Sequence, residues 1–310
     1  MYVVDQSSHR IQRFIAGALH SRVNAESLHF PTLGSNLGTT VAGITSNGGI
    51  SVTQLKSPTA IFVTPSSFMY IVDNGNQRIQ KWRIGEPSGS TVAGGNGPGS
   101  ALSQISISYG IYIHNEYNIY VSDYGNHRVV LWNAGNTTGG RLVAGGNGNG
   151  NADNQLSLPY GIYVDQNGTL YIAEYGNHII SKWLPSKTTM FLMHFSRQYL
   201  DAKFGITIAG ETAVAGSWSY QLSRPTSVIF DEFNSIFVMD SGNKRIQRWR
   251  IGSTYGVTVA QSWELNGPIG MNFDTDSNLV VADHLNNQVV SFRVNCCAYN
   301  IASFSKIVKS

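Results

Sequence analysis

The chain has 310 residues with a formal net charge of +3, and 13% of them are charged. This charged fraction is well below the roughly 25% of an average soluble protein. So small a net charge argues against a dedicated nucleic-acid surface, which needs a clustered basic face. No apolar run approaches the roughly 18 residues of a membrane helix, so none is expected. The 33 glycines, with many Asn, Ser and Thr residues, are typical of a β-rich, turn-rich protein.

One pattern recurs along the chain. Its best copy reads Tyr-Ile-Val-Asp-Asn-Gly-Asn-Gln-Arg-Ile-Gln-Lys-Trp and spans residues 70–82. The six copies, of which the first and last are the weakest, are residues 2–14, 70–82, 120–132, 171–183, 237–249 and 280–292. Self-similarity of this size indicates stacked supersecondary units, none of which buries its apolar face alone.

The first copy begins at its second strand. Met1 stands where the other copies hold an apolar residue of that strand, and no basic-then-apolar leader precedes it. We therefore expect the first unit to lack its inner strand because the chain is truncated at its amino end. A strand supplied by the tail is the alternative.

The stretch from 104 to 145 shows one unit in full. Short apolar strands are predicted at 110–113, 119–122, 128–132 and 141–144. Short strands separated by turns rich in glycine and asparagine indicate an antiparallel sheet. Four such strands, followed by a repeat of the pattern, are typical of a propeller blade. The sequence therefore predicts an all-β fold, a six-bladed β-propeller of four-stranded antiparallel blades with an incomplete first blade.

The turn between the second and third strands is the most constrained part of each unit. Gly and Asn follow the acidic residue, and we expect them to supply the positive backbone angle of a tight hairpin. The acidic residue faces an arginine across this turn, which predicts a structural clamp. The pairs are Asp5 with Arg10, Asp73 with Arg78, Asp123 with Arg128, and Asp240 with Arg245. Glu174 and Asp283 face Ile179 and Gln288 instead, which leaves these two carboxylates free for another task.

An aromatic residue closes every copy and predicts packing between blades rather than a ligand cage. These residues are Phe14, Trp82, Trp132, Trp183, Trp249 and Phe292. Two intervals between copies are longer than the others, because they contain residues 19–34 and 188–204. Three interpretations of each insertion remain open: a functional loop, a flexible loop without a function, or an artefact of the gene model.

The core Asp-x-Gly-Asn-x-Arg-[Ile/Val]-x-x-Trp resembles the signature of the NHL-repeat family of β-propellers. The linking pieces 91–94, 142–145 and 206–210 fit as well, and the resemblance covers roughly residues 1 to 295. We take 1–295 as the propeller domain and 296–310 as a tail that is a candidate closing strand. Cys296 and Cys297 are expected to be unpaired thiols in this tail.

The resemblance implies a fold and leaves the activity open. Related six-bladed propellers include amidating lyases with zinc-bound histidines and calcium-dependent lactonases. Another branch carries the propeller behind a tripartite motif and binds RNA or recruits substrates for ubiquitin transfer. Three histidines of this chain share one turn position and three lie in the insertions, so only His114 and His284 remain as metal ligands. We predict no catalytic residue, no metal site and no cofactor.

The turns between second and third strands share one face with the links between blades, called here the top face. The residue that follows each acidic position varies among the copies. Such variation is expected of a surface that recognises a ligand, and it is also expected of turn residues that are under no constraint. The candidate ligand-binding residues are Asn74, Tyr124, Tyr175, Ser241 and His284, with Glu174 and Asp283. Two glycosylation sequons, at Asn136 and Asn167, fall on the opposite, bottom face.

The leading hypothesis is therefore a non-catalytic propeller that binds a protein or small ligand through its top face. A metal-dependent hydrolase or lyase is the first alternative, and an RNA-binding or ubiquitin-linked adaptor is the second. A monomer is expected, at the cell surface or outside the cell if the chain is part of a longer protein.

Overall fold

The computed structural model describes residues 1–14, 38–115, 118–133, 136–185 and 204–293, together with the backbone of 304–309. The two insertions, apart from Phe204, and both cysteines lie outside the described residues. No helix in the described part of the chain has the length and apolar character needed to cross a membrane.

Six antiparallel sheets follow one another along the chain. The first blade holds β1 (Tyr2–Asp5), β2 (Arg10–Arg13) and β3 (Thr39–Gly43). The second holds β4 (Ala60–Val63), β5 (Phe68–Asp73), β6 (Arg78–Arg83) and β7 (Gly89–Gly94). The third holds β8 (Ser108–His114), β9 (Asn118–Asp123), β10 (Arg128–Asn133) and β11 (Arg141–Gly145).

The remaining three blades have four strands each. The fourth holds β12 (Pro159–Val164), β13 (Leu170–Glu174), β14 (Ile179–Trp183) and β15 (Gly205–Gly210). The fifth holds β16 (Pro225–Phe230), β17 (Ile236–Asp240), β18 (Arg245–Trp249) and β19 (Val257–Gln261). The sixth holds β20 (Pro268–Phe273), β21 (Leu279–Asp283), β22 (Gln288–Phe292) and β23 (Phe304–Lys309).

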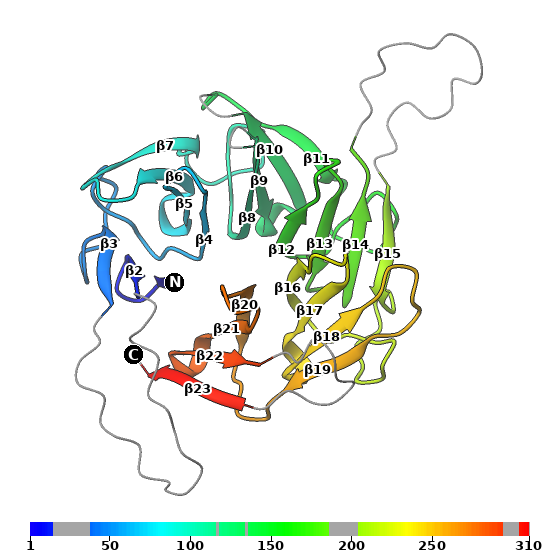
Figure 1. Cartoon of the computed structure of the whole chain (residues 1–310). Coiled ribbons are helices and arrows are strands. Elements are labelled where there is room, and N and C mark those ends of the chain that lie inside the picture. Colours follow the sequence, from blue (N-terminus) through cyan, green and yellow to red (C-terminus); the bar gives the residue numbers. More distant parts are fainter. Residues whose placement is uncertain (15–37, 116–117, 134–135, 186–203, 294–303, 310) are drawn as a thin grey trace, which may run out of the picture.

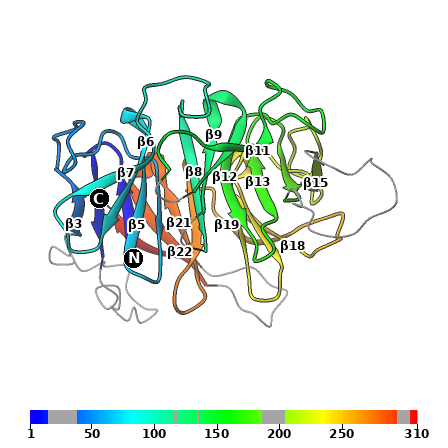
Figure 2. The same ribbon diagram turned by 90° about the horizontal axis from the view of Figure 1, so that it is seen from above.

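Within each blade, strands pair in sequence order from the innermost to the outermost. Figure 1 shows the six blades arranged around a common axis, and Figure 2 shows the same ring from the side. The predicted all-β six-bladed propeller is thus confirmed. In the first blade β1 is the counterpart of β5, so this sheet has three strands and lacks the innermost one. In the last blade β23 pairs with β22 as the outermost strand.

Among the described residues the core forms five apolar clusters, each of which joins two successive blades. Trp132 of the third blade packs with Tyr70, Val72 and Ile79 of the second. Trp82 likewise packs with residues of the first blade. The other closing residues do the same, namely Trp183, Trp249 and Phe292. The prediction that these rings pack between blades is confirmed for these five positions, because each is at most 2% exposed.

Candidate ligand-binding site

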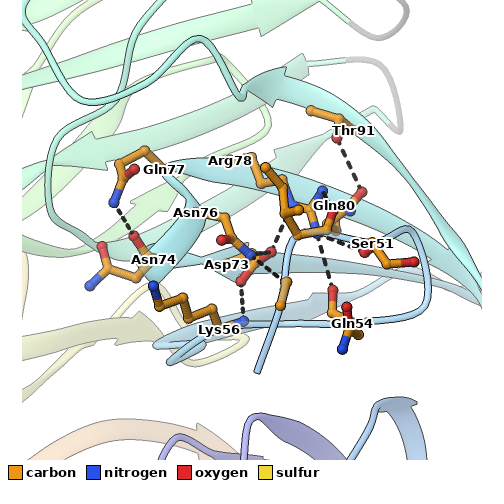
Figure 3. A network of polar contacts seen from close by, with 12 residues as sticks. Ser51, Gln54, Lys56, Asp73, Asn74, Asn76, Gln77, Arg78, Gln80 and Thr91 are labelled. Atoms are coloured by element: carbon orange, nitrogen blue, oxygen red, sulfur yellow. Dashed lines mark hydrogen bonds and ion pairs between the residues drawn. The ribbon is translucent and has the colours of Figure 1, made fainter. Parts of the chain in front are cut away.

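The turn clamp sets the geometry of the top face (Figure 3). Asp73, at the end of β5, accepts hydrogen bonds from the backbone N–H of Lys56 at 2.6 Å and from Asn76 Nδ2 at 2.8 Å. Arg78 Nε donates to the same carboxylate at 2.7 Å. The other guanidinium nitrogens donate to the carbonyl oxygens of three residues in the link that enters the blade, Ile50, Ser51 and Gln54. One arginine thus joins the hairpin to the link.

The same network recurs in two other blades. Arg128 and Arg245 donate from Nε to Asp123 and Asp240 at 2.8 and 2.7 Å, and both pairs are buried. Asp5 and Arg10 make the corresponding ion pair in the first blade, where the two side chains are 25% and 22% exposed. Burial raises the pKa of Asp240, and its hydrogen bonds and the charge of Arg245 oppose this effect. All four predicted pairs are therefore brought together.

The glycine of this turn has another role than the one expected. The positive φ falls one residue after the asparagine, at Gln77, His127, His178 and Lys244, and not at the glycine or the asparagine. A Cβ on Gly75 or Gly242 would lie 2.7 or 2.8 Å from a carbonyl oxygen of the incoming link. The glycine is required because the link passes so closely, and the expectation of a positive angle there was wrong.

The two carboxylates without an arginine are buried, at 2% exposure for Glu174 and 0% for Asp283. Asp283 accepts hydrogen bonds from Gln288 Nε2, Asn286 Nδ2 and the backbone N–H of Asn266. It is therefore engaged in the clamp of its own blade. Glu174 accepts from Asn177 Nδ2 at 2.7 Å and from the N–H of Ser157 at 3.2 Å. Burial raises the pKa of Glu174 to about 7.

Four tyrosines gather on the top face of the third and fourth blades, and we call Tyr109, Tyr124, Tyr160 and Tyr175 the tyrosine cluster. The rings of Tyr109 and Tyr160 are stacked, with centroids 4.5 Å apart and an interplanar angle of 5°. Tyr124 meets Tyr109 edge-on at 5.1 Å, and Tyr175 lies 6.0 Å from Tyr160. All four side chains are partly exposed. Burial raises the pKa of Tyr124 and of Tyr160, so these phenols are neutral at physiological pH.

Two kinds of element supply these rings. Tyr124 and Tyr175 come from the turns after β9 and β13, as predicted, whereas Tyr109 and Tyr160 come from the starts of the inner strands β8 and β12. Sequence reasoning missed this second pair. The repeated tetrapeptide Tyr-Gly-Ile-Tyr at 109–112 and 160–163 was the signal that could have found it.

Glycine at the second place of this tetrapeptide lets the inner strands approach each other. A Cβ on Gly110 would lie 2.2 Å from the carbonyl oxygen of Tyr160. The second and fifth blades hold threonine at the tyrosine position, and Thr59 and Thr226 donate to a carbonyl oxygen of the next blade at 2.6 and 3.0 Å. In the third and fourth blades a stacked tyrosine therefore takes the place of this hydrogen-bonded threonine.

The remaining candidates occupy the equivalent turns of other blades. Asn74 Oδ1 accepts from the N–H of Ser108, which fixes the chain beside Tyr109. Ser241 and His284 are the first residues of the one-turn 3-10 helices in the fifth and sixth blades. The guanidinium carbon of Arg224 lies 5.8 Å from the ring centroid of Tyr175, at the edge of the cluster.

Histidines at the top face support the links between blades. The Nδ1 atoms of His127 and His178 accept hydrogen bonds from the backbone N–H groups of Leu158 and Arg224 at 3.2 and 3.1 Å. Burial lowers the pKa of both imidazoles, which keeps Nδ1 an acceptor at neutral pH. Within the described ranges there is no group of three His, Cys, Asp or Glu residues placed to hold a metal ion.

Both sequon asparagines are exposed. Asn167 lies in the turn between β12 and β13, and Asn136 lies between β10 and β11. These turns are at the opposite ends of their strands from the turns that carry Tyr124 and Tyr175.

Comparison with known proteins gives the fold alone. No family model matches the chain. A nidogen, solved in complex with laminin, is similar over 93% of this chain and 88% of its own, with a TM-score of 0.62 and 16% identity. A gluconolactonase from Xanthomonas campestris covers 81% of this chain and 76% of its own, with a TM-score of 0.56 and 13% identity.

A streptogramin B lyase covers 81% of this chain and 68% of its own, with a TM-score of 0.52 and 12% identity. The chain therefore shares its propeller fold with a binding protein and with enzymes.

Proposed function

We propose that this chain is an NHL-type propeller that acts as a non-catalytic scaffold and binds a protein partner through the tyrosine cluster on its top face. The observation that carries the proposal is the stack of Tyr109 on Tyr160, flanked by Tyr124 and Tyr175, with all four rings partly exposed. A small ring-bearing ligand is the alternative occupant of the same cluster.

Tyrosine suits such a surface for physical reasons. Its ring provides a large apolar contact area, its hydroxyl group stays hydrogen-bonded to water or to a partner, and only two side-chain torsions must be fixed on binding. Tyrosine is accordingly enriched at the centres of protein interfaces. In the tyrosine cluster the rings already hold one another, so a partner would meet a preorganised surface. The likeness to a nidogen solved with laminin agrees with protein binding.

The buried arginines are engaged within the fold, which argues against phosphate recognition by these residues at this face. Arg78, Arg128 and Arg245 each donate to one carboxylate and three carbonyl oxygens of their own blade. A nucleic-acid backbone is bound by exposed cations that neutralise its phosphates. These three residues are part of the fold instead, which favours a protein over RNA.

The experiment is a selection of peptides from a random displayed library on the immobilised propeller. Selected peptides are then measured against Tyr124→Ala and Tyr175→Ala, with Asn136→Ala and Asn167→Ala as matched variants of the bottom face. We expect each tyrosine variant to lose about tenfold or more in affinity, the loss typical of an interface hot spot. Peptides that bind all variants alike would disprove the assignment of the top face. Turnover of a lactone that depends on a divalent ion would favour the enzyme alternative.

A further inference from the structure

A small cavity in the fourth blade lies where the first, second, third and fifth blades hold an arginine. Its volume is about 50 Å³, and Asn151, Ala152, Gln155, Glu174, Ile179 and Ser181 line it, among others. Asn151 and Ala152 are exposed, so the cavity reaches the surface, and the Glu174 that lines it is buried. The cavity is separate from the tyrosine cluster and independent of the proposed function.

The third blade shows what normally fills this place. Arg128 Nε donates to Asp123 at 2.8 Å. Its terminal nitrogens donate to the carbonyl oxygens of Ser100, Ala101 and Gln104. Arg78 and Arg245 make the same set of four contacts in the second and fifth blades. The fold therefore builds one guanidinium receptor in each of these three blades.

The fourth blade keeps the acceptors of that receptor and loses the donor. Asn151, Ala152 and Gln155 stand at the positions of Ser100, Ala101 and Gln104 in the link that enters the blade. Matching hydrogen bonds show that the link follows the same path in both blades. Asn177 donates to the carbonyl oxygen of Gly150 at 2.9 Å, and Asn126 donates to that of Gly99 at 2.8 Å. The arginine itself is replaced by Ile179, whose short apolar side chain reaches none of these oxygens by a hydrogen bond.

The charge of the cavity is also unbalanced. Glu174 is 2% exposed, and among the described residues the groups that donate hydrogen bonds to it are neutral, namely Asn177, Ser157 and Ser181. A second acidic residue, Asp153, lines the same cavity. Burial of an ionised carboxylate without a cation is costly in free energy. Because burial disfavours the ionised form, it raises the pKa of Glu174 to about 7. A bound cation would remove that cost.

We propose that this cavity binds a guanidinium group supplied from outside the chain. Glu174 and the carbonyl oxygens of Asn151, Ala152 and Gln155 accept its N–H donors, as the matching groups do for the arginines of the sister blades. A planar guanidinium has a fixed fork of donors that matches several acceptors at once, whereas a lysine ammonium or an alkali ion is a point charge. The ligand is a small guanidine compound or an arginine side chain of a peptide.

The test uses the full chain labelled with ¹⁵N, titrated with methylguanidinium chloride at about pH 8, where Glu174 is ionised. We expect saturable shifts of the Asn177 side-chain amide and of the Ser157 backbone amide, because both groups donate to Glu174. The control is the double variant Glu174→Asp with Ile179→Arg, which restores the residue pair of the sister blades and should fold. Its own arginine occupies the cavity, so both shifts should disappear.

Further titrations separate the sources of the ligand and the kinds of cation. A Gly-Arg-Gly peptide that gives the same shifts shows that the cavity accepts an arginine side chain, and a response to methylguanidinium alone restricts it to small ions. Both results support the proposal. Equal shifts with potassium chloride, shifts that persist in the double variant, or no saturable change in the unmodified chain would overturn it.

Discussion

Arg78 Nε lies 2.7 Å from Asp73 Oδ2, and neither side chain is more than 7% exposed. Their strands, β5 and β6, pair so that these two residues face each other at the end of the hairpin. The same arginine also holds the link that enters the blade, so the ion pair connects two segments that are distant in sequence. The stability of the propeller should therefore depend on its buried clamps.

Loss of a buried clamp arginine should be far more costly than loss of the exposed one. Arg78→Met leaves Asp73 buried without its cation, which typically costs about 3–5 kcal/mol. Arg10→Met removes an ion pair that is about a quarter exposed, and such a pair contributes about 1 kcal/mol or less. Urea unfolding of the two variants measures both values. Equal losses would mean that the clamp is not a principal source of stability.

Removal of a closing tryptophan should loosen the contact between blades. Trp132 is 0% exposed and packs against the second blade, so Trp132→Ala should lower the free energy of unfolding by about 3–5 kcal/mol. Trp263→Ala is the matched control, because that ring is 81% exposed and a surface substitution changes stability by about 0.5 kcal/mol or less. A Trp132 variant as stable as this control would contradict the packing described here.

Gly110→Ala should disturb both stability and the tyrosine cluster. The new Cβ would lie 2.2 Å from the carbonyl oxygen of Tyr160, which forces β8 and β12 apart and costs about 1–3 kcal/mol. Gly139→Ala is the control, since the nearest atom to its Cβ lies at 3.9 Å. Tyrosine circular dichroism in the near ultraviolet reports the stacking of Tyr109 on Tyr160. An unchanged spectrum in the Gly110 variant would show that the close approach does not position these rings.

Glu174 should make the protein less stable as the pH rises from about 4.5 to about 7. The folded state holds the proton of Glu174 up to a pKa of about 7, above the usual value of 4.5. Its contribution is fully present below pH 4.5, declines as the unfolded chain ionises first, and is lost by about pH 7, a change of about 3 kcal/mol.

Glu174→Gln removes this titration, so the difference in unfolding free energy between the unmodified chain and the variant isolates it. We expect the unmodified chain to lose stability relative to the variant across this pH range in urea unfolding experiments. A difference that does not vary with pH would mean that Glu174 is ionised as easily in the folded state as in the unfolded one.

The sequence predicted those features that depend on residues close together in one hairpin. Asp73 and Arg78 are five positions apart around a tight turn, so their pairing follows from strand register alone. The closing tryptophans were predictable because a large ring at one position of every repeat needs a buried place. The role of Gly75 was misjudged because the atom it must avoid belongs to Lys56, in a link whose path is a tertiary property.

The candidate site was predicted only in part for the same reason. Tyr124 and Tyr175 could be named from their turns, but Tyr109 and Tyr160 meet across two blades, and inner strands vary more than the repeat core. The sequence showed that Glu174 faces Ile179 instead of an arginine. It could not show the cavity beside Glu174, because the cavity also depends on the path of the link that enters the blade.

The central claim is that a partner occupies the tyrosine cluster, and amide hydrogen exchange with and without a selected peptide tests it most directly. Bound peptide should slow exchange at the starts of β8 and β12 and in the turns that carry Tyr124 and Tyr175. It should leave the turns at Asn136 and Asn167 unchanged. Protection of those two turns, with unchanged exchange around Tyr109 and Tyr160, would contradict it.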